Sequence, residues 1–159
     1  MQLTLDYLAN HRDRIPQLAA WSYAEWRDVI HERGFTFDDV LAGFHRRAST
    51  DAIPLGIVAF ADGELAGNGA LRPDDLPPRP HLAPWVGGIF VAPAYRGHGI
   101  ASAIVARLVE DARRLQVPQL YLWTHSAVGL YARLGWTELE KLDYCGHTIT
   151  VMVRQVDAG

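Results

Sequence analysis

FVAPAYRGHGIASAIVARLV, the stretch from Phe90 to Val109, leaves an apolar strand through a proline, passes an arginine and two glycines, and enters a long helix. The apolar residues Ile100, Ile104 and Leu108 follow helical spacing. The free N–H groups and the dipole at the start of a helix attract anions, and small residues let a phosphate approach the backbone. We therefore predict an anion-binding loop over residues 96–102.

The strand before this loop, WVGGIFV, contains two adjacent glycines, Gly87 and Gly88. Glycine weakens the interior of a strand, so this pair predicts a bulge or a close approach of another chain or a ligand to the backbone. A ligand with amides in its arm and a pyrophosphate at its end could pair with the strand and finish at the helix. Coenzyme A has that shape.

Two other interpretations of the loop compete with a coenzyme A site. A structural turn that needs glycine explains a bare Gly-x-Gly equally well. A Rossmann dinucleotide site is disfavoured, because Ser102 stands where a third glycine or alanine is expected and the next strand ends without a carboxylate. A P-loop is excluded because no Gly-Lys-Ser/Thr follows.

The rest of the chain predicts one mixed α/β (α+β) domain over residues 1–159. The Asp62-Gly63 pair between two apolar runs indicates a hairpin, and Thr36 is a candidate helix cap. The β-α-β segment around the loop implies one parallel, right-handed crossover in a mostly antiparallel sheet. The expected elements are strand 3–9, helix 11–32 with a break near Pro16, helix 36–48, hairpin 54–72, an exposed proline-rich loop 71–84, strand 85–93, helix 99–116, strand 119–124, helix 126–135 and a final strand pair over 136–156.

Composition limits the possible function classes. The chain has 159 residues, of which 49% are apolar and 21% charged, as in a globular protein, and the net charge of −3 argues against a nucleic-acid partner. The single cysteine, Cys145, cannot form an internal disulfide, and no pair among the seven histidines has helical metal-ligand spacing, so we expect no metal. No signal peptide or membrane-spanning run is recognisable, which predicts a cytoplasmic protein without a membrane partner.

Two motifs resemble those of one known family. IFVAPAYRGHGIASAIV is similar to the coenzyme A-binding motif of the GNAT family of N-acetyltransferases, Val-x-Pro-x-x-Arg/Gln-x-x-Gly-x-Gly/Ala. THSAVGLYARLGWTELE resembles the next motif of that family, a helix with a tyrosine three residues before Leu-Gly-Phe/Trp. Tyr131 follows Arg96 by 35 residues, which is the family's separation, and the order of the predicted elements also matches.

The resemblance implies acetyl-coenzyme A as cosubstrate and a V-shaped splay of the sheet where it binds. The splayed strand would pair through its backbone with the pantetheine arm, and the loop and the first turn of the helix would hold the pyrophosphate. The residues implied in cofactor binding are Ile89, Phe90 and Val91 for the arm, Arg96, Gly97, His98, Gly99, Ile100, Ala101 and Ser102 for the pyrophosphate, and Thr124, which stands where many members have asparagine.

The resemblance also implies that Tyr131 assists the leaving thiolate, although a core tyrosine on an amphipathic helix is the alternative. Deprotonating a lysine-like amine at pH 7 costs about 4.6 kcal/mol, so a general base is expected. The strand WVGGIFV has no carboxylate, which leaves Asp74, Asp75 or His81 on the proline-rich loop, with Asp75 preferred. These acids are equally well explained as residues that only solvate a loop.

The predicted function is therefore transfer of an acetyl group from acetyl-coenzyme A to a primary amine of a small molecule or peptide. An inactive acyl-coenzyme A-binding regulatory module is the alternative, and a nicotinamide-dependent oxidoreductase is a more distant one. The aromatics Trp21, Tyr23 and Trp85, together with the loop acids, would suit a cationic amine. A homodimer through the final strands is possible.

Overall fold

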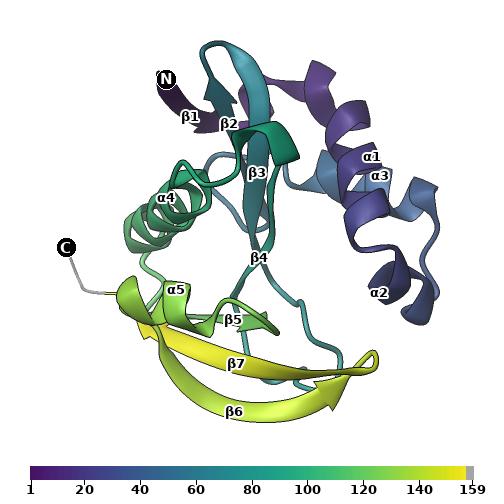
Figure 1. Cartoon of the computed structure of the whole chain (residues 1–159), viewed down its shortest axis with the longest axis vertical. Coiled ribbons are helices and arrows are strands. Elements are labelled where there is room, and N and C mark those ends of the chain that lie inside the picture. The colour runs from purple at the N-terminus through teal and green to yellow at the C-terminus, as the bar shows by residue number, and fades with distance from the viewer. Residues whose placement is uncertain (157–159) are drawn as a thin grey trace.

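The computed structural model of the chain describes residues 1–156 and contains a seven-stranded sheet. The strand order is β1-β2-β3-β4-β5-β7-β6, and every neighbouring pair is antiparallel except β4 and β5 (Figure 1). The predicted mixed α/β sheet with one parallel pair is confirmed. The strands are β1 (Leu3–Tyr7), β2 (Leu55–Ala61), β3 (Glu64–Arg72), β4 (Trp85–Val91), β5 (Gln119–Thr124), β6 (Thr137–Tyr144) and β7 (His147–Gln155).

Helices cover both faces of the β1–β4 half of the sheet (Figure 1). The helices are α1 (Ile15–Glu25), α2 (Arg27–Glu32), α3 (Phe37–Arg46), α4 (Ile100–Arg114) and α5 (Val128–Arg133). Side chains alternate along a strand, so β2 presents Ile57 to the cluster that contains Ile104 of α4, and Val58 to the cluster that contains Leu18 of α1 and Phe44 of α3. No helix in the described part of the chain is long and apolar enough to cross a membrane.

The two halves of the sheet separate at β4. Gly88 has φ +61°, and the register between β3 and β4 shifts so that Gly88 and Ile89 both stand opposite Gly69. β4 pairs with β5 in register only at Trp85 and Tyr121, and the β5-β7-β6 half then turns away (Figure 1). The predicted bulge and the splay are both confirmed. The edge of β4 beyond the bulge is therefore not paired with β5.

The N-terminal helical region differs from the prediction of one helix broken near Pro16. Pro16 lies in the first turn of α1, where its missing N–H costs no hydrogen bond. The break comes instead at Trp26, whose φ of −107° and ψ of 22° are not helical, and α2 begins at Arg27. Two short 3-10 turns, Leu8–Asn10 and Arg12–Arg14, precede α1.

The predicted cap of α3 is present as a reciprocal capping box. The Thr36 side chain accepts a hydrogen bond from the Asp39 N–H, and the Asp39 carboxylate accepts one from the Thr36 N–H. Both bonds satisfy N–H groups that a helix start otherwise leaves without partners. The α3 helix thus begins at a defined residue.

We expect Thr36→Ala to lower the free energy of unfolding by about 1 kcal/mol, because it removes one of these bonds. Urea unfolding measures this change. The matched control is Thr50→Ala, at an exposed threonine whose hydroxyl makes no hydrogen bond with the described residues. Equal unfolding midpoints for the two variants would contradict the cap's contribution.

Candidate functional site

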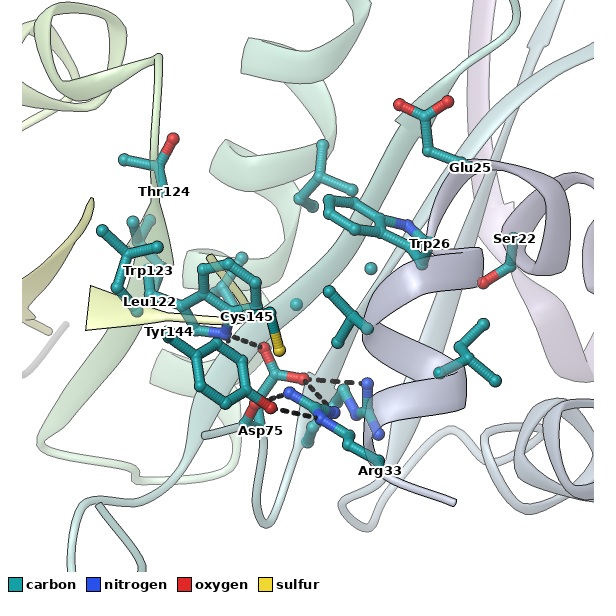
Figure 2. A pocket seen from close by; sticks show the side chains of 18 of the residues that line it. Ser22, Glu25, Trp26, Arg33, Asp75, Leu122, Trp123, Thr124, Tyr144 and Cys145 are labelled. Carbon is teal, nitrogen blue, oxygen red and sulfur yellow. Dashed lines mark hydrogen bonds and ion pairs between the residues drawn. The ribbon is translucent and has the colours of Figure 1, made fainter. Parts of the chain in front are cut away.

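A pocket of about 560 Å³ opens where β4 and β5 diverge. It is lined by α2 and α3 on one side, by the bulge of β4, and by the end of β5 and the residues that lead into α5 on the other. Figure 2 shows lining side chains from the region of α1 and α2, such as Trp26 and Arg33, and from β5 and β6, such as Trp123 and Tyr144. The pocket therefore begins where the pairing between β4 and β5 ends.

The loop before α4 has an open backbone. Gly97 and Gly99 have φ values of +84° and +76°, in the left-handed region that favours glycine. A Cβ atom at either position would meet no protein atom within 4 Å, so the space beside them is not filled by the protein. Gly99, the residue that caps α4, has no side chain that could bond the N–H groups at the helix start. The Ala103 N–H donates to the Gly99 carbonyl and makes the first hydrogen bond of the helix. The N–H groups at the start of this helix are thus suited to an anion from outside.

The Arg96 side chain folds back onto the end of β4. Its Nε donates to the Val91 carbonyl at 2.8 Å, and its guanidinium lies 5.7 Å from the centre of the Phe90 ring. These contacts join the loop to the strand. The exposed residues His98 and Gly97 then form the turn between Arg96 and α4.

Tyr131 lies on α5 and lines the pocket. The residue is only 9% exposed, and its ring makes an edge contact with Trp136. Burial raises the pKa of Tyr131 above its usual value, so the hydroxyl is protonated at neutral pH. Within residues 1–156 the hydroxyl has no hydrogen-bond partner, which leaves it available as a donor.

Thr124 ends β5 and also lines the pocket (Figure 2). Its Oγ1 accepts a hydrogen bond from the Ala127 N–H at 3.1 Å and a longer one from the Ser126 N–H at 3.4 Å. These bonds fix the entry into α5. Because the hydroxyl only accepts in both, its own proton is free for a ligand.

Asp75 is the most buried acid of the pocket lining, and its carboxylate lies among nitrogen donors from separate segments (Figure 2). Oδ1 is 2.9 Å from Arg72 Nη1 and 4.0 Å from Arg33 Nη1, and Oδ2 accepts from Trp123 Nε1 at 3.1 Å. Burial raises the pKa of Asp75, and the charges of Arg72 and Arg33 oppose that rise. The prediction of an exposed loop over residues 71–84 is wrong at Asp75 and Leu76, which are buried. The prolines of this loop stay near the surface.

The same network connects the two halves of the molecule. Arg33, which follows α2, donates from Nε to the Tyr144 hydroxyl at 2.8 Å and from Nη2 to the Asp75 carbonyl. Tyr144 ends β6 and Trp123 lies on β5, so the cluster joins α2 to the far half of the sheet. A Cβ at Gly87 would lie 2.8 Å from Asp75 Oδ2, which explains the first of the two strand glycines.

Several residues considered from the sequence lie elsewhere. Asp74 and His81 are exposed and do not line the pocket. Of the proposed aromatic wall, Trp85 is fully buried with its Nε1 bonded to the Leu82 carbonyl, and Trp21 packs against Phe90. Tyr23 stacks edge-on against Phe37 outside the pocket.

The pocket includes residues that no sequence pattern indicated, chiefly Trp26, Trp123, Arg33 and Arg47. Helical spacing assigns Trp26 to a core stripe, and the Arg46-Arg47 pair is an ordinary cationic helix end. Only the three-dimensional packing brings them to one cavity. Among the described residues no group of three or more His, Cys, Asp or Glu side chains could hold a metal ion.

The family model described as the acetyltransferase (GNAT) family matches residues 15–136. This chain belongs to the GNAT family. The match includes the β4 bulge, the glycine loop, α4 and Tyr131.

Known proteins similar to this GNAT chain agree with the assignment. An amino-acid acetyltransferase of Mycobacterium tuberculosis (strain ATCC 25618 / H37Rv) is 38% identical over 71 residues, which cover 45% of this chain and only 40% of that protein. The solved structure of yncA, an acetyltransferase from Salmonella typhimurium with its cofactor acetyl-CoA, has a TM-score of 0.71 at 20% identity and covers 99% of this chain and 95% of its own. An aminoglycoside 6'-N-acetyltransferase complexed with coenzyme A has a TM-score of 0.73 at 13% identity, with coverage of 99% and 98%.

Proposed function

We propose that the protein is an N-acetyltransferase that moves the acetyl group of acetyl-coenzyme A to a primary amine. The observation that carries the proposal is the arrangement of three features along β4 and the pocket beside it. Ile89 on the unpaired edge of β4 and the protonated Tyr131 hydroxyl face the pocket, and the open glycine loop at the start of α4 follows β4 outside the pocket lining. The structures of the Salmonella typhimurium protein with acetyl-CoA and of the aminoglycoside 6'-N-acetyltransferase with coenzyme A share this fold and support the proposal.

The splayed strand and the loop fit the two parts of coenzyme A. The backbone of Ile89, Phe90 and Val91 would pair with the amides of the pantetheine arm, as an added strand does. The main-chain N–H groups of residues 96–102 would hold the pyrophosphate at the positive end of α4. Thr124, across the splay on β5, would donate its free proton to the same ligand.

When bound, acetyl-coenzyme A supplies a thioester whose carbonyl an amine can attack. Tyr131 donates a hydrogen bond to the sulfur as negative charge develops there. Its raised pKa makes complete proton transfer to a thiolate unfavourable, so stabilisation by the hydrogen bond is its main contribution. The N–H of Ile89, in the bulge, would stabilise charge on the carbonyl oxygen.

Asp75 remains our candidate for accepting the proton of the amine. It is the carboxylate of the pocket whose burial raises the pKa, and a higher pKa makes a carboxylate a better base near neutral pH. Arg72 and Arg33 hold the carboxylate in place through Oδ1. The other acids of the pocket lining, Glu25, Asp28 and Asp39, are exposed.

We expect Gly97→Ala to weaken coenzyme A binding tenfold or more, because a methyl group would enter the space that a phosphate needs. Gly63→Ala is the matched control. Gly63 has the same φ of +84° and the same open surroundings, but it lies in the β2–β3 hairpin. Isothermal titration calorimetry measures the affinities. Equal affinity for the two variants would show that the loop does not hold the phosphates.

Release of free thiol from acetyl-coenzyme A with a panel of primary amines tests the proposed function. The expected result is release that depends on the amine and yields the N-acetylated product. Binding of acetyl-coenzyme A without turnover on any amine would instead identify a regulatory binding module. No binding at all would overturn the proposal.

A further inference from the structure

Arg47 is a buried cation of the pocket that has no hydrogen-bond or ion-pair partner among residues 1–156. It follows α3, is only 8% exposed, and its Nη1 is fully buried. Its guanidinium makes no hydrogen bond or salt bridge with any of residues 1–156. The guanidinium does stack 4.4 Å from the centre of the Phe44 ring, which orients the group but satisfies none of its N–H donors.

An unpaired buried cation is unfavourable, and native proteins almost always supply a partner. Burial, followed by repulsion from Arg72, lowers the pKa of Arg47 to about 9, so the group is still charged at neutral pH. The main chain of Arg47 is held in place, since its carbonyl accepts from the Gly56 N–H of β2 at 2.8 Å. Together with the Phe44 contact, this places a buried positive charge that has no acceptor within the described part of the chain.

The Arg47 guanidinium lies beside the part of β4 where we propose that the acetyl group is transferred. A Cβ built on Gly88 would lie 3.5 Å from Arg47 Nη1, so the guanidinium lies against the bulge of β4. Trp26 contributes a second buried donor to the same pocket lining, because its Nε1 also has no partner among the described residues. Both nitrogens are covered by protein and lack partners, so the wall of this cavity carries unsatisfied donors and a positive charge, which favours an anion.

The nearby Asp75 carboxylate attracts Arg47 but forms no ion pair with it. Asp75 is instead bonded to Arg72 and approached by Arg33, so three arginines share this one carboxylate. Arg46 also lines the pocket. The remaining acids of the lining are exposed to solvent, where water and salt screen them. The buried part of the pocket therefore favours a negative group.

We propose that Arg47 binds the carboxylate of the acceptor, and that the acceptors are small amino acids in which the amine and the carboxylate are a few bonds apart. This inference rests on the proposed function, because it takes the bulge as the place where the amine reacts. A carboxylate on Arg47 brings the amine of such a molecule to the neighbouring Ile89. Polyamines and aminoglycosides, which carry several positive charges and no carboxylate, would meet an uncompensated cation.

The test compares L-amino acids with their carboxamides, which keep the same amine and side chain but lack the negative charge. For the best acceptor we expect kcat/KM to be at least tenfold higher for the acid than for the amide. Arg47→Met, which keeps an unbranched apolar side chain but removes the guanidinium, should lose that preference by lowering the rate with the acid. Arg27→Met, at an exposed arginine outside the pocket lining, should keep the preference.

Binding without acetyl-coenzyme A provides a second readout. By calorimetry, N-acetyl-L-amino acids should bind the wild-type protein at least tenfold more tightly than N-acetyl amino-acid amides, and Arg47→Met should remove the difference. The thermal unfolding midpoint of the Arg47→Met variant should equal or exceed that of the wild type, since the substitution removes an unpaired buried charge. A strongly lowered midpoint with an unchanged preference for acids would show that Arg47 is structural.

The outcomes separate this inference from the proposed function. If amides or other amines without a carboxylate release thiol as fast as amino acids, the acetyltransferase assignment stands and the role of Arg47 is refuted. If N-acetyl amino acids bind through Arg47 but no amine causes thiol release, the carboxylate site stands and the proposed reaction fails.

Discussion

Asp75→Ala is expected to lower the free energy of unfolding by about 3–5 kcal/mol, the range for removing one partner of a buried ion pair. The substitution leaves the guanidinium groups of Arg72 and Arg33 and the indole N–H of Trp123 without their carboxylate. Since Arg33 also bonds to Tyr144, the loss would loosen the contact between α2 and the far half of the sheet. Urea unfolding followed by tryptophan fluorescence measures the effect.

Asp74→Ala is the control, because the neighbouring aspartate is exposed and lies outside the network. We expect it to change stability by no more than about 0.5 kcal/mol. Similar losses for the two variants would mean that the arginines around Asp75 do not depend on its carboxylate. In that case Asp75 would be free to act only as a proton acceptor.

Tyr131→Phe is expected to lower kcat tenfold or more while the affinity for coenzyme A stays near that of the wild type. The variant removes only the hydroxyl, whose hydrogen bond is proposed to form as the sulfur gains charge. A bond made mainly in the transition state affects turnover rather than binding of the ground state. Steady-state kinetics, together with calorimetry for coenzyme A, separates the two quantities.

Tyr121→Phe controls for the loss of a buried tyrosine hydroxyl. Tyr121 lies on β5, is 8% exposed and does not line the pocket; its hydroxyl accepts from Gln119. Turnover should stay close to the wild-type value in this variant. If Tyr131→Phe left turnover equally unaffected, Tyr131 would have no part in the mechanism and would be a core residue that happens to line the pocket.

The parts of the fold that the sequence predicts are those that depend on local chemistry. Gly87 and Gly88 predict the bulge because glycine destabilises the interior of a regular strand. Asp62-Gly63 predicts the hairpin turn, in which both residues have positive φ. The cap at Thr36 depends only on Asp39, three residues later in the chain. In each case the cause lies within a few residues of the feature.

The parts that the sequence does not predict depend on contacts between distant segments. The sequence alone indicates that Asp75 is a solvated loop residue, but in the fold it contacts Arg33 and Trp123, which lie 42 and 48 positions away. The sequence likewise indicates that Arg47 is an ordinary residue at a helix end, but in the fold it lies beside β4. The spacing of residues along the chain does not reveal these contacts, so the sequence indicates the cofactor motif but not the residues that line the pocket.

A crystal structure of the protein with coenzyme A tests the central claim most directly. The account predicts the pyrophosphate on the N–H groups of residues 96–102, the pantetheine arm along β4 from Ile89, and the sulfur within hydrogen-bonding distance of the Tyr131 hydroxyl. Coenzyme A bound elsewhere, or with its sulfur directed away from Tyr131, would contradict it.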